Sequence, residues 1–196
     1  MSEKELEERA IIDKNQYVAI EQFIKEKYPD YILLHLKNRY FDDAKKTIKS
    51  IKNMLRIRSI KGKNYREFTY KVKGDDEDIE YNQLLSYYQF NKIIFSSRYP
   101  TGEVLEKLKS DNVDISSLKS LVELRTRRME VKLKDYTIVL DANEYNGVVD
   151  YDIEIESIIS KNHAKTLLLQ FCEQFNIEYK NDYPTKSNRA FRSINY

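Results

Sequence analysis

The sequence has few of the residues that cross-link a chain or interrupt its regular structure. Its 196 residues include one cysteine, no tryptophan, four glycines and three prolines. The lone Cys172 cannot form an internal disulfide, and the two histidines, His35 and His163, are too far apart in sequence to resemble zinc ligands. We therefore expect neither a disulfide scaffold nor a thiolate or imidazole metal site. Without a linker rich in glycine or proline, the chain is expected to form a single domain over residues 1–196.

Long hydrophobic runs and an excess of one charge are also lacking. No apolar run approaches the roughly 20 residues that cross a bilayer, and acidic residues follow soon after the first methionine. We therefore expect no membrane partner, no export and a cytoplasmic location. The 34 basic and 32 acidic residues leave a net charge of +2, which gives no strong signal for nucleic acid. A hydrophobic content of 41%, with 16 tyrosines, favours a folded protein over a disordered one.

Four segments have the spacing of helices. The clearest follows Asp13, where Tyr17, Ile20 and Phe23 recur on one face and Asp13 or Asn15 can cap the first turn. The others are predicted over about residues 82–96, after Pro100 and Thr101, and over residues 161–175.

Between these helices apolar residues alternate with polar ones, which is the pattern of half-buried strands. The alternation covers NMLRIRSI (53–60), REFTYKVKG (66–74), KDYTIVLDA (134–142) and VVDYDIEIES (148–157). The segment NEYNG between the last two is predicted to be a hairpin turn. The pattern indicates an α+β fold in which a mostly antiparallel sheet has helices outside it.

The polar faces of these strands are sorted by the sign of their charge. Arg56 and Arg58 share one face of their strand, as do Lys71 and Lys73 of the next. The acidic faces carry Asp150, Asp152, Glu154 and Glu156 in one strand, and Glu5 and Glu7, together with Arg9, in ELEER (5–9). Solvent-exposed sheet faces are the ordinary explanation of charged alternation, but they usually mix the two signs. The sorting therefore favours strands that line a cavity, as in an antiparallel barrel of about eight strands.

These motifs resemble, in order, those of the CYTH superfamily, also called the triphosphate tunnel metalloenzymes. ELEER is similar to the ExExK signature that opens the family, with Arg9 in place of lysine. The further likenesses are NRYFDD (38–43), MLRIR (54–58), FTYKVKG (68–74), RTRRME (125–130), LDANEYNGVVDYDIEIE (140–156) and TKSNRAFR (185–192), the last resembling a final Lys/Arg-rich strand. The resemblance covers nearly the whole chain. The layout resembles small bacterial CYTH proteins labelled as adenylate cyclases.

The resemblance implies a closed eight-stranded antiparallel β-barrel with helices packed outside, whose tunnel binds a triphosphate. Carboxylates would hold Mg²⁺ or Mn²⁺ at one side, since these hard ions prefer oxygen ligands. The residues assigned to the metal are Glu5, Glu7, Asp152, Glu154 and Glu156. Asp152 stands where the family usually has glutamate, so its shorter side chain leaves its role open.

Basic residues at the other side of the tunnel would grip phosphate, because guanidinium groups bind its oxygens bidentately and lysines act as adaptable point charges. The residues assigned to phosphate are Arg56, Arg58, Lys71, Lys73, Arg128, Lys186 and Arg189, with Arg192 as an alternative to Arg189. In RTRR the resemblance selects Arg128, while Arg125 and Arg127 point the opposite way. Arg9 is assigned to a phosphate or a water, and arginine in place of the family's lysine is either tolerated or impairs the chemistry. Asp141 is assigned to positioning metal or water, with a strand-ending turn aspartate as its alternative.

The function implied by the resemblance is metal-dependent hydrolysis of a triphosphate. One metal ion would bridge phosphate oxygens, and a second, bound by the acidic strands, would lower the pKa of a water that attacks the terminal phosphorus as a diphosphate departs. The expected partner is a triphosphate-containing small molecule, either inorganic tripolyphosphate or an organic or nucleoside triphosphate. A class IV type adenylate cyclase, which makes cyclic AMP and pyrophosphate from ATP, is the first alternative. A non-catalytic polyphosphate or nucleotide sensor is the second, and an interaction protein with charged surface strands is a third. Whether the chain forms a homodimer stays open.

Overall fold

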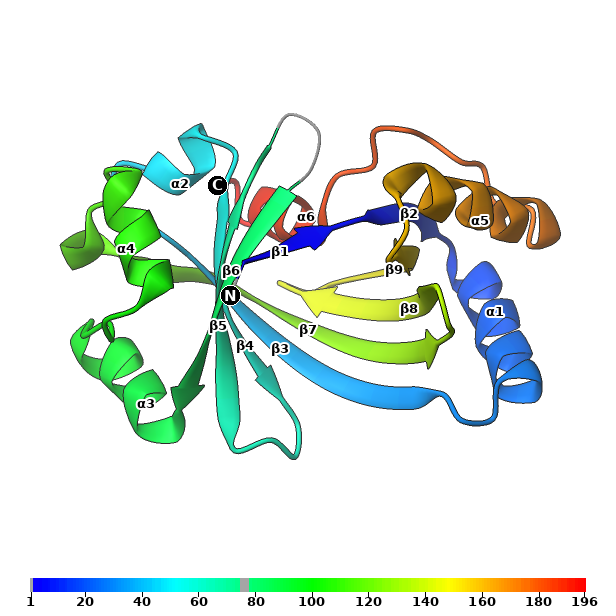
Figure 1. The fold of residues 1–196 in the computed structure, drawn as a ribbon, viewed down its shortest axis with the longest axis horizontal. Coiled ribbons are helices and arrows are strands. Elements are labelled where there is room, and N and C mark those ends of the chain that lie inside the picture. Colours follow the sequence, from blue (N-terminus) through cyan, green and yellow to red (C-terminus); the bar gives the residue numbers. More distant parts are fainter. Residues whose placement is uncertain (1, 75–77) are drawn as a thin grey trace. The chain divides into compact units, whose positions relative to one another are not determined.

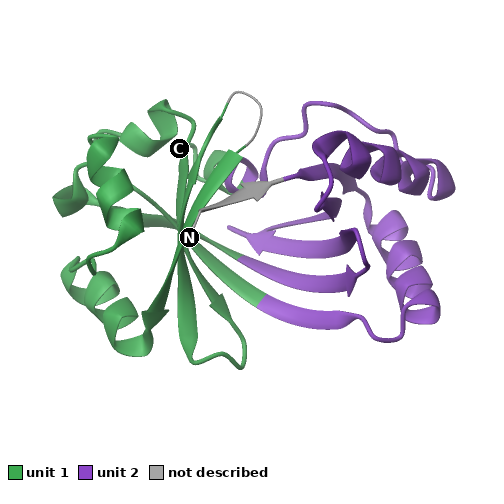
Figure 2. Cartoon of the chain, in the orientation of Figure 1, with its two compact units in different colours: residues 1–5, 36–124, 190–196 green, residues 6–35, 125–189 purple. Residues whose placement is uncertain are grey.

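The computed structural model of the chain describes residues 2–74 and 78–196, and for residues 2–5 it describes the backbone alone (Figure 1). The chain divides into two compact units (Figure 2). Unit 1 comprises residues 1–5, 36–124 and 190–196, and unit 2 comprises residues 6–35 and 125–189. The single domain over residues 1–196 stays a prediction.

The described chain has the α+β composition that the sequence indicates. Its strands are β1 (Ser2–Glu5), β2 (Glu7–Ile12), β3 (Ile32–Asp42), β4 (Met54–Ile60), β5 (Tyr65–Val72), β6 (Asp78–Ser86), β7 (Lys119–Lys132), β8 (Tyr136–Tyr145) and β9 (Val148–Ser157). Its helices are α1 (Lys14–Lys27), α2 (Thr47–Ser50), α3 (Tyr87–Ser96), α4 (Glu103–Ser110), the short 3₁₀ helix η1 (Ile115–Ser117), α5 (Lys161–Gln174) and α6 (Lys186–Arg192). None of the helices within residues 2–74 and 78–196 is long and apolar enough to cross a membrane.

Unit 1 contains antiparallel strands in the order β1-β6-β5-β4-β3, and the first part of β7 belongs to it as well. The alternation in β4 places Leu55 and Ile57 in a buried core with Phe68 of β5, where helices α3 and α4 contact the sheet. Arg56 and Arg58 therefore lie on the other face of β4, because successive side chains of a strand point to opposite sides. The predicted sorting of apolar and basic faces is confirmed for this strand.

Unit 2 contains the second part of β7 followed by β8, β9 and β2. Its apolar face packs against α1 and α5, with Ile153 and Ile155 of β9 fully buried beside Ile20 and Leu168. Helix α1 begins as predicted at Asp13, whose carboxylate accepts a hydrogen bond from the backbone N–H of Gln16 at 2.9 Å in a capping box. The acidic face of β9 lies on the opposite side from these helices.

The hairpin predicted between the last two strands is confirmed. Strand β8 continues to Tyr145, which pairs with Val148, so that only Asn146 and Gly147 form the loop. Both loop residues have positive φ, 45° and 77°, which is the backbone that a tight two-residue hairpin turn requires. The turn sets the register that brings Asp141 opposite Asp152 on the paired strands.

One predicted helix begins too early, and one predicted strand is wrong. The helix expected over residues 82–96 begins only at Tyr87, because Asp78–Ser86 forms strand β6, paired along its length with β5. The final strand expected at 185–192 is instead helix α6, whose first turn is capped by Thr185 Oγ1 accepting from the Asn188 N–H at 3.2 Å. The strand order of neither unit closes on itself, so the closed eight-stranded barrel is not confirmed.

Candidate functional site

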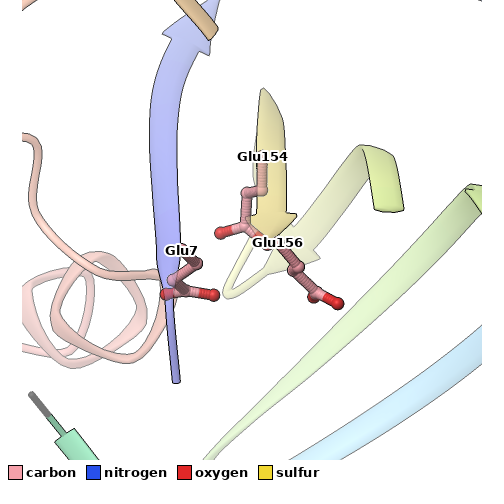
Figure 3. Close-up of side chains that lie close together, drawn as sticks. All are labelled: Glu7, Glu154 and Glu156. Atoms are coloured by element: carbon pink, nitrogen blue, oxygen red, sulfur yellow. The ribbon is translucent and has the colours of Figure 1, made fainter. Parts of the chain in front are cut away.

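Strands β2 and β9 bring three glutamates together. Their antiparallel register sets Glu7 opposite Glu156 and Arg9 opposite Glu154. One carboxylate oxygen from each of Glu7, Glu154 and Glu156 lies within 4.8 Å of the others. Figure 3 shows the three side chains approaching one another from the two strands. We call this group the open acidic cluster.

The open acidic cluster suits a hard divalent cation. Its donors are carboxylate oxygens, the ligands that such ions prefer. The side chain of Glu156 is 45% exposed and that of Glu7 is 15% exposed, whereas Glu154 is buried at 3%. An ion can therefore approach from solvent and still contact a buried carboxylate. The side chain of Glu5, also predicted to bind metal, lies outside the described residues.

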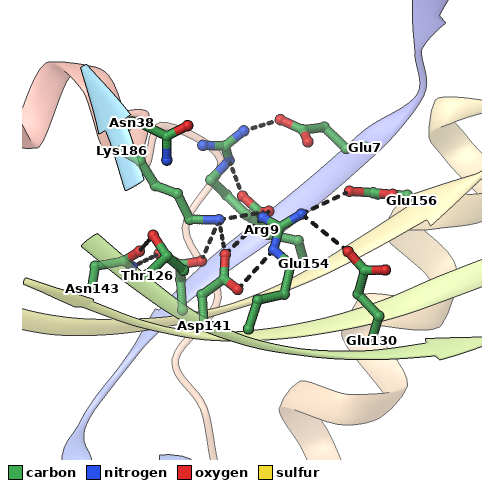
Figure 4. Close-up of polar contacts among 12 residues, drawn as sticks. Glu7, Arg9, Asn38, Thr126, Glu130, Asp141, Asn143, Glu154, Glu156 and Lys186 are labelled. Atoms are coloured by element: carbon green, nitrogen blue, oxygen red, sulfur yellow. Dashed lines mark hydrogen bonds and ion pairs between the residues drawn. The ribbon is translucent and has the colours of Figure 1, made fainter. Parts of the chain in front are cut away.

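A second group of carboxylates shares Glu154 and lies deeper in unit 2. Oxygens of Asp141, Asp152 and Glu154 lie within 4.8 Å of one another, and all three residues are buried. The Lys186 ammonium forms ion pairs with Asp141, with Asp152 Oδ1 at 3.0 Å and with Glu154 Oε2 at 2.7 Å. Figure 4 shows Lys186 reaching down to Asp141 and Glu154. We call this group the buried acidic cluster.

Arg128 also contacts the buried acidic cluster. Its Nε and a terminal nitrogen donate to the two oxygens of Asp141 at 2.9 and 2.8 Å, and its guanidinium lies 3.5 Å from Glu154. Arg127, the next residue of β7, points to the other face and donates to the Tyr17 hydroxyl at 2.6 Å. The opposite orientations predicted for these two arginines are confirmed. The position of Asp141, buried within β8, rules out the alternative of a strand-ending turn aspartate.

The C-terminal basic residues contact carboxylates. Arg189 donates to Asp150 Oδ2 at 2.7 Å and to Asp152 Oδ2 at 2.5 Å, from the same helix that carries Lys186. The Asn143 amide, in the segment that the sequence reading assigned to a turn, donates to Asp152 at 2.9 Å. The phosphate role predicted for Lys186 and Arg189 stays a prediction, because the contacts that the structure gives them are with acids.

Burial and fixed charges set the protonation of this site. Burial raises the pKa of Glu154, but the charges of Lys186, Arg9 and Arg128 outweigh it and hold that pKa well below its usual range. The pKa of Glu156 is raised, chiefly by burial, against the opposing charge of Arg128. Burial lowers the pKa of Lys186, but its carboxylate partners more than compensate, so the ammonium stays charged. Glu154 therefore stays ionised at neutral pH through its contacts with these cations.

Unit 1 holds the other predicted phosphate ligands, on the polar faces of β4 and β5. Arg56 lies 3.3 Å from Glu80 of β6, and Lys71 and Lys73 lie 3.2 and 2.8 Å from Asp78 of the same strand. The sequence pattern predicted no strand over Asp78–Ser86, and therefore gave no reason to place Asp78 and Glu80 beside β5.

Arg58 completes this basic group. Its guanidinium donates to Asn38 Oδ1 at 2.9 Å and lies 3.8 Å from Glu67. The charge of the group is thus largely balanced within unit 1. Burial raises the pKa of the buried Glu80, but the charges of Arg56, Lys71 and Arg58 outweigh it and lower that pKa, so Glu80 is ionised at neutral pH.

Replacing Glu80 with glutamine is expected to lower stability and raise anion affinity. The change leaves Arg56 without its charged partner, which costs about 2 kcal/mol of unfolding free energy at pH 7. Because the folded-state pKa of Glu80 is lowered, its stabilisation is present above the unfolded pKa and is lost as the pH falls through the folded value. The stability difference from wild type should therefore vanish in acid, as urea unfolding at several pH values would show.

The same Glu80→Gln variant should bind tripolyphosphate more tightly, about tenfold, because one negative charge leaves the basic group. The control is Glu106→Gln, which removes an exposed charge from α4 of the same unit. Weaker tripolyphosphate binding by the Glu80 variant in calorimetry, with the control unchanged, would contradict this account of the basic group.

Neither of two other reactive residues joins these groups. Cys172 is buried in the core of unit 2, where burial raises the pKa of its thiol to about 11. His35 lies exposed in β3. Neither Cys172 nor His35 is therefore assigned to the chemistry of the site.

Comparison with known proteins identifies the family. Residues 3–190 match the family model described as the CYTH domain. The chain belongs to the CYTH family. This CYTH protein is 29% identical over 155 residues to a Bacillus subtilis strain 168 protein provisionally named triphosphatase YjbK, covering 79% of this chain and 78% of that protein.

Two solved structures resemble this CYTH protein over nearly its full length. One, from Bacillus halodurans and provisionally named an adenylate cyclase, has a TM-score of 0.86 at 28% identity, with 97% of this chain and 98% of that chain covered. The other, a provisionally named adenylyl cyclase HpAC1 from Hippeastrum, is described as having a dominant triphosphatase activity. It has a TM-score of 0.76 at 20% identity, with 99% and 96% covered, and shows the shared fold.

Proposed function

We propose that the chain hydrolyses a triphosphate and releases orthophosphate, with Mg²⁺ or Mn²⁺ as its cofactor. The substrate is inorganic tripolyphosphate or an organic or nucleoside triphosphate. The observation that carries the proposal is the open acidic cluster on β2 and β9, a partly exposed set of carboxylates in a CYTH fold. The triphosphatase name of the Bacillus subtilis relative and the activity described for the Hippeastrum protein support it.

Glu7, Glu154 and Glu156 would hold the metal ion through one oxygen each. Such an ion supplies positive charge to phosphate oxygens and lowers the pKa of water. Glu154 suits this role because its lowered pKa keeps it ionised without the ion. Asp152, also predicted to bind metal, contributes to the buried acidic cluster instead and contacts Lys186 and Arg189.

The chain's own cations would bind the substrate. Arg56, Arg58, Lys71 and Lys73 would exchange their carboxylate partners for phosphate oxygens and stabilise the charge that develops on the departing diphosphate. Arg9 would contact a phosphate or orient the attacking water from its place beside Glu7 and Glu154. Asp141, which is buried between Arg128 and Lys186, would position these two cations.

A cyclase is the second candidate, favoured by the name of the Bacillus halodurans structure. The deciding experiment measures orthophosphate release from tripolyphosphate and from ATP with Mg²⁺, with Mn²⁺ and with chelator, and measures cyclic AMP in the ATP samples. Metal-dependent orthophosphate release supports the triphosphatase. Cyclic AMP with pyrophosphate would replace it with the cyclase, and tight binding of tripolyphosphate without turnover would replace it with a sensor.

Replacing Arg9 with methionine is expected to separate metal binding from turnover. The Arg9 guanidinium contacts Glu7 and lies 3.4 Å from Glu154, so it competes with a metal ion for the same carboxylates. Without this charge the dissociation constant for Mn²⁺ should fall about tenfold. The kcat should fall about tenfold or more, because a charged contact to the substrate is lost.

Calorimetry with Mn²⁺ and steady-state kinetics measure the two effects of Arg9→Met. Lys132→Met, which removes an exposed charge at the end of β7, is the matched control and should change neither quantity by more than about twofold. Weaker Mn²⁺ binding by the Arg9 variant would show that the guanidinium does not compete with the ion.

A further inference from the structure

We propose that Lys186 is a built-in counter-ion that occupies the buried acidic cluster and limits unit 2 to a single divalent ion, at the open acidic cluster. The inference rests on the metal requirement of the proposed function. It adds that the two groups of carboxylates, which share Glu154, have different occupants. One takes an ion from solvent, and the other is filled by a side chain of the same protein.

The contacts of Lys186 are those that a bound cation would make. Its Nζ contacts one oxygen of each of the three carboxylates, Asp141, Asp152 and Glu154. The ammonium therefore stands where an ion bound by the buried acidic cluster would have to stand. A divalent ion can enter only if Lys186 leaves.

Access also distinguishes the two clusters. The side chains of Asp141 and Asp152 are fully buried and that of Glu154 is 3% exposed. Mg²⁺ sheds its water reluctantly and usually keeps several waters when it is bound by protein. The open acidic cluster has the partly exposed Glu156 at its edge, where a bound ion can keep some of its waters.

Cations of the protein already contact each carboxylate of the buried acidic cluster. Arg128 binds both oxygens of Asp141, Arg189 donates to Asp152 at 2.5 Å, and Arg9 lies 3.4 Å from Glu154, in addition to Lys186. A divalent ion added while Lys186 stays in place would bring two further positive charges into a buried site, which is strongly unfavourable.

Helix α6 explains how Lys186 reaches this position. Thr185 caps the helix, so Lys186 stands in its first turn, and Arg189 follows three residues later on the same side. Both side chains then reach the acidic face of β9, where Lys186 meets Glu154 and Arg189 meets Asp150 and Asp152. A strand at 185–192 would have sent residues 186 and 189 to opposite faces.

The test counts Mn²⁺ ions bound per chain by titration, with the electron paramagnetic resonance signal of free Mn²⁺ as the readout. Wild type should bind one ion. Lys186→Met should bind two, because the buried acidic cluster loses its counter-ion while its carboxylates remain. The matched control is Lys180→Met, which removes an exposed lysine of the same unit and should still bind one ion.

A double variant, Glu7→Gln with Glu156→Gln, decides the question even if Lys186→Met does not fold. It dismantles the open acidic cluster and keeps the Lys186 contacts, so it should bind no ion. Unfolding of Lys186→Met followed by circular dichroism, with and without Mn²⁺, gives a second readout. The free energy of unfolding should rise towards the wild-type value when the ion takes the place of the ammonium.

Several results would overturn the inference. Two ions on wild type, one ion retained by the double variant, or a folded Lys186→Met variant that still binds one ion would each show that Lys186 does not exclude a metal. The first and the third would leave the proposed function standing, whereas an ion retained by the double variant would also remove the open acidic cluster as its metal site. No bound ion on wild type would instead remove the metal requirement itself, and the inference with it.

Discussion

A Glu154→Gln variant is expected to lose about 10³-fold in metal-dependent triphosphatase activity, the largest functional effect of any single substitution considered for this chain. Glu154 belongs to both acidic clusters, and its carboxylate contacts Arg9, Lys186 and Arg128. The substitution removes one ligand of the proposed ion, and it also leaves those cations with one carboxylate fewer.

The loss should appear in kcat/KM for tripolyphosphate measured at saturating Mn²⁺, and Mn²⁺ affinity should fall in the same variant. Glu144→Gln removes an exposed carboxylate from the neighbouring strand β8 and is the matched control, expected to keep activity within about twofold. Activity within about threefold of wild type in the Glu154 variant would show that the open acidic cluster takes no part in the reaction.

An Arg128→Ala variant is expected to lose about 3–5 kcal/mol of unfolding free energy, the largest effect on stability. The guanidinium is buried and binds both oxygens of Asp141, which is fully buried itself. Truncation leaves that carboxylate with the Lys186 ammonium as its remaining cationic contact. Urea unfolding followed by circular dichroism at pH 7 measures the loss.

The pH dependence of the same loss tests its cause. Burial raises the pKa of Asp141, but the charges of Arg128 and Lys186 outweigh it and hold that pKa below its usual range. A lowered folded-state pKa contributes stability above the unfolded value of about 4, and this contribution disappears as the pH falls through the folded value. The difference between wild type and Arg128→Ala should therefore shrink in acid.

Arg127→Ala is the control for this prediction, because Arg127 lies on the opposite face of β7 and pairs with Tyr17 and Glu21 of α1. Its partly exposed contacts predict a loss of about 1 kcal/mol. A loss of the same small size for Arg128→Ala would mean that the ion pair with Asp141 contributes little to the free energy of unfolding.

The faces of the strands could be predicted from sequence because alternation along a strand is a local property. Leu55 and Ile57 lie in the core while Arg56 points away, and Ile153 is buried beneath the helices while Glu154 joins the acidic clusters. No knowledge of the neighbouring strands was needed for either assignment. The order of the motifs resembled the CYTH family, and the family match over residues 3–190 confirms that the chain belongs to it.

The partners of these side chains could not be predicted, because they depend on contacts far apart in sequence. Lys186 meets Asp141, 45 residues away, and Glu154, 32 residues away. The sequence reading placed Lys186 on a strand and assigned it to phosphate. A seven-residue helix has little apolar periodicity of its own, so its conformation is decided by packing and by the cap at Thr185.

A second failure had a local cause. The helix predicted over residues 82–96 begins too early, because strand β6 continues to Ser86, where the cap of α3 begins. Asp78 and Glu80, the acids that balance the basic group of unit 1, precede the predicted helix and lie in the same strand. A serine followed three residues later by Gln89 was the available signal for the boundary, because this pair forms the capping box of α3.

The most direct test of the proposed function is phosphorus NMR of the products formed from tripolyphosphate and from ATP in ¹⁸O-labelled water, with Mn²⁺ and with chelator. The proposal predicts metal-dependent orthophosphate that carries one ¹⁸O atom, because water attacks the terminal phosphorus and the diphosphate leaves with its own oxygens. Unlabelled pyrophosphate with cyclic AMP, or spectra that do not change with Mn²⁺, would contradict it.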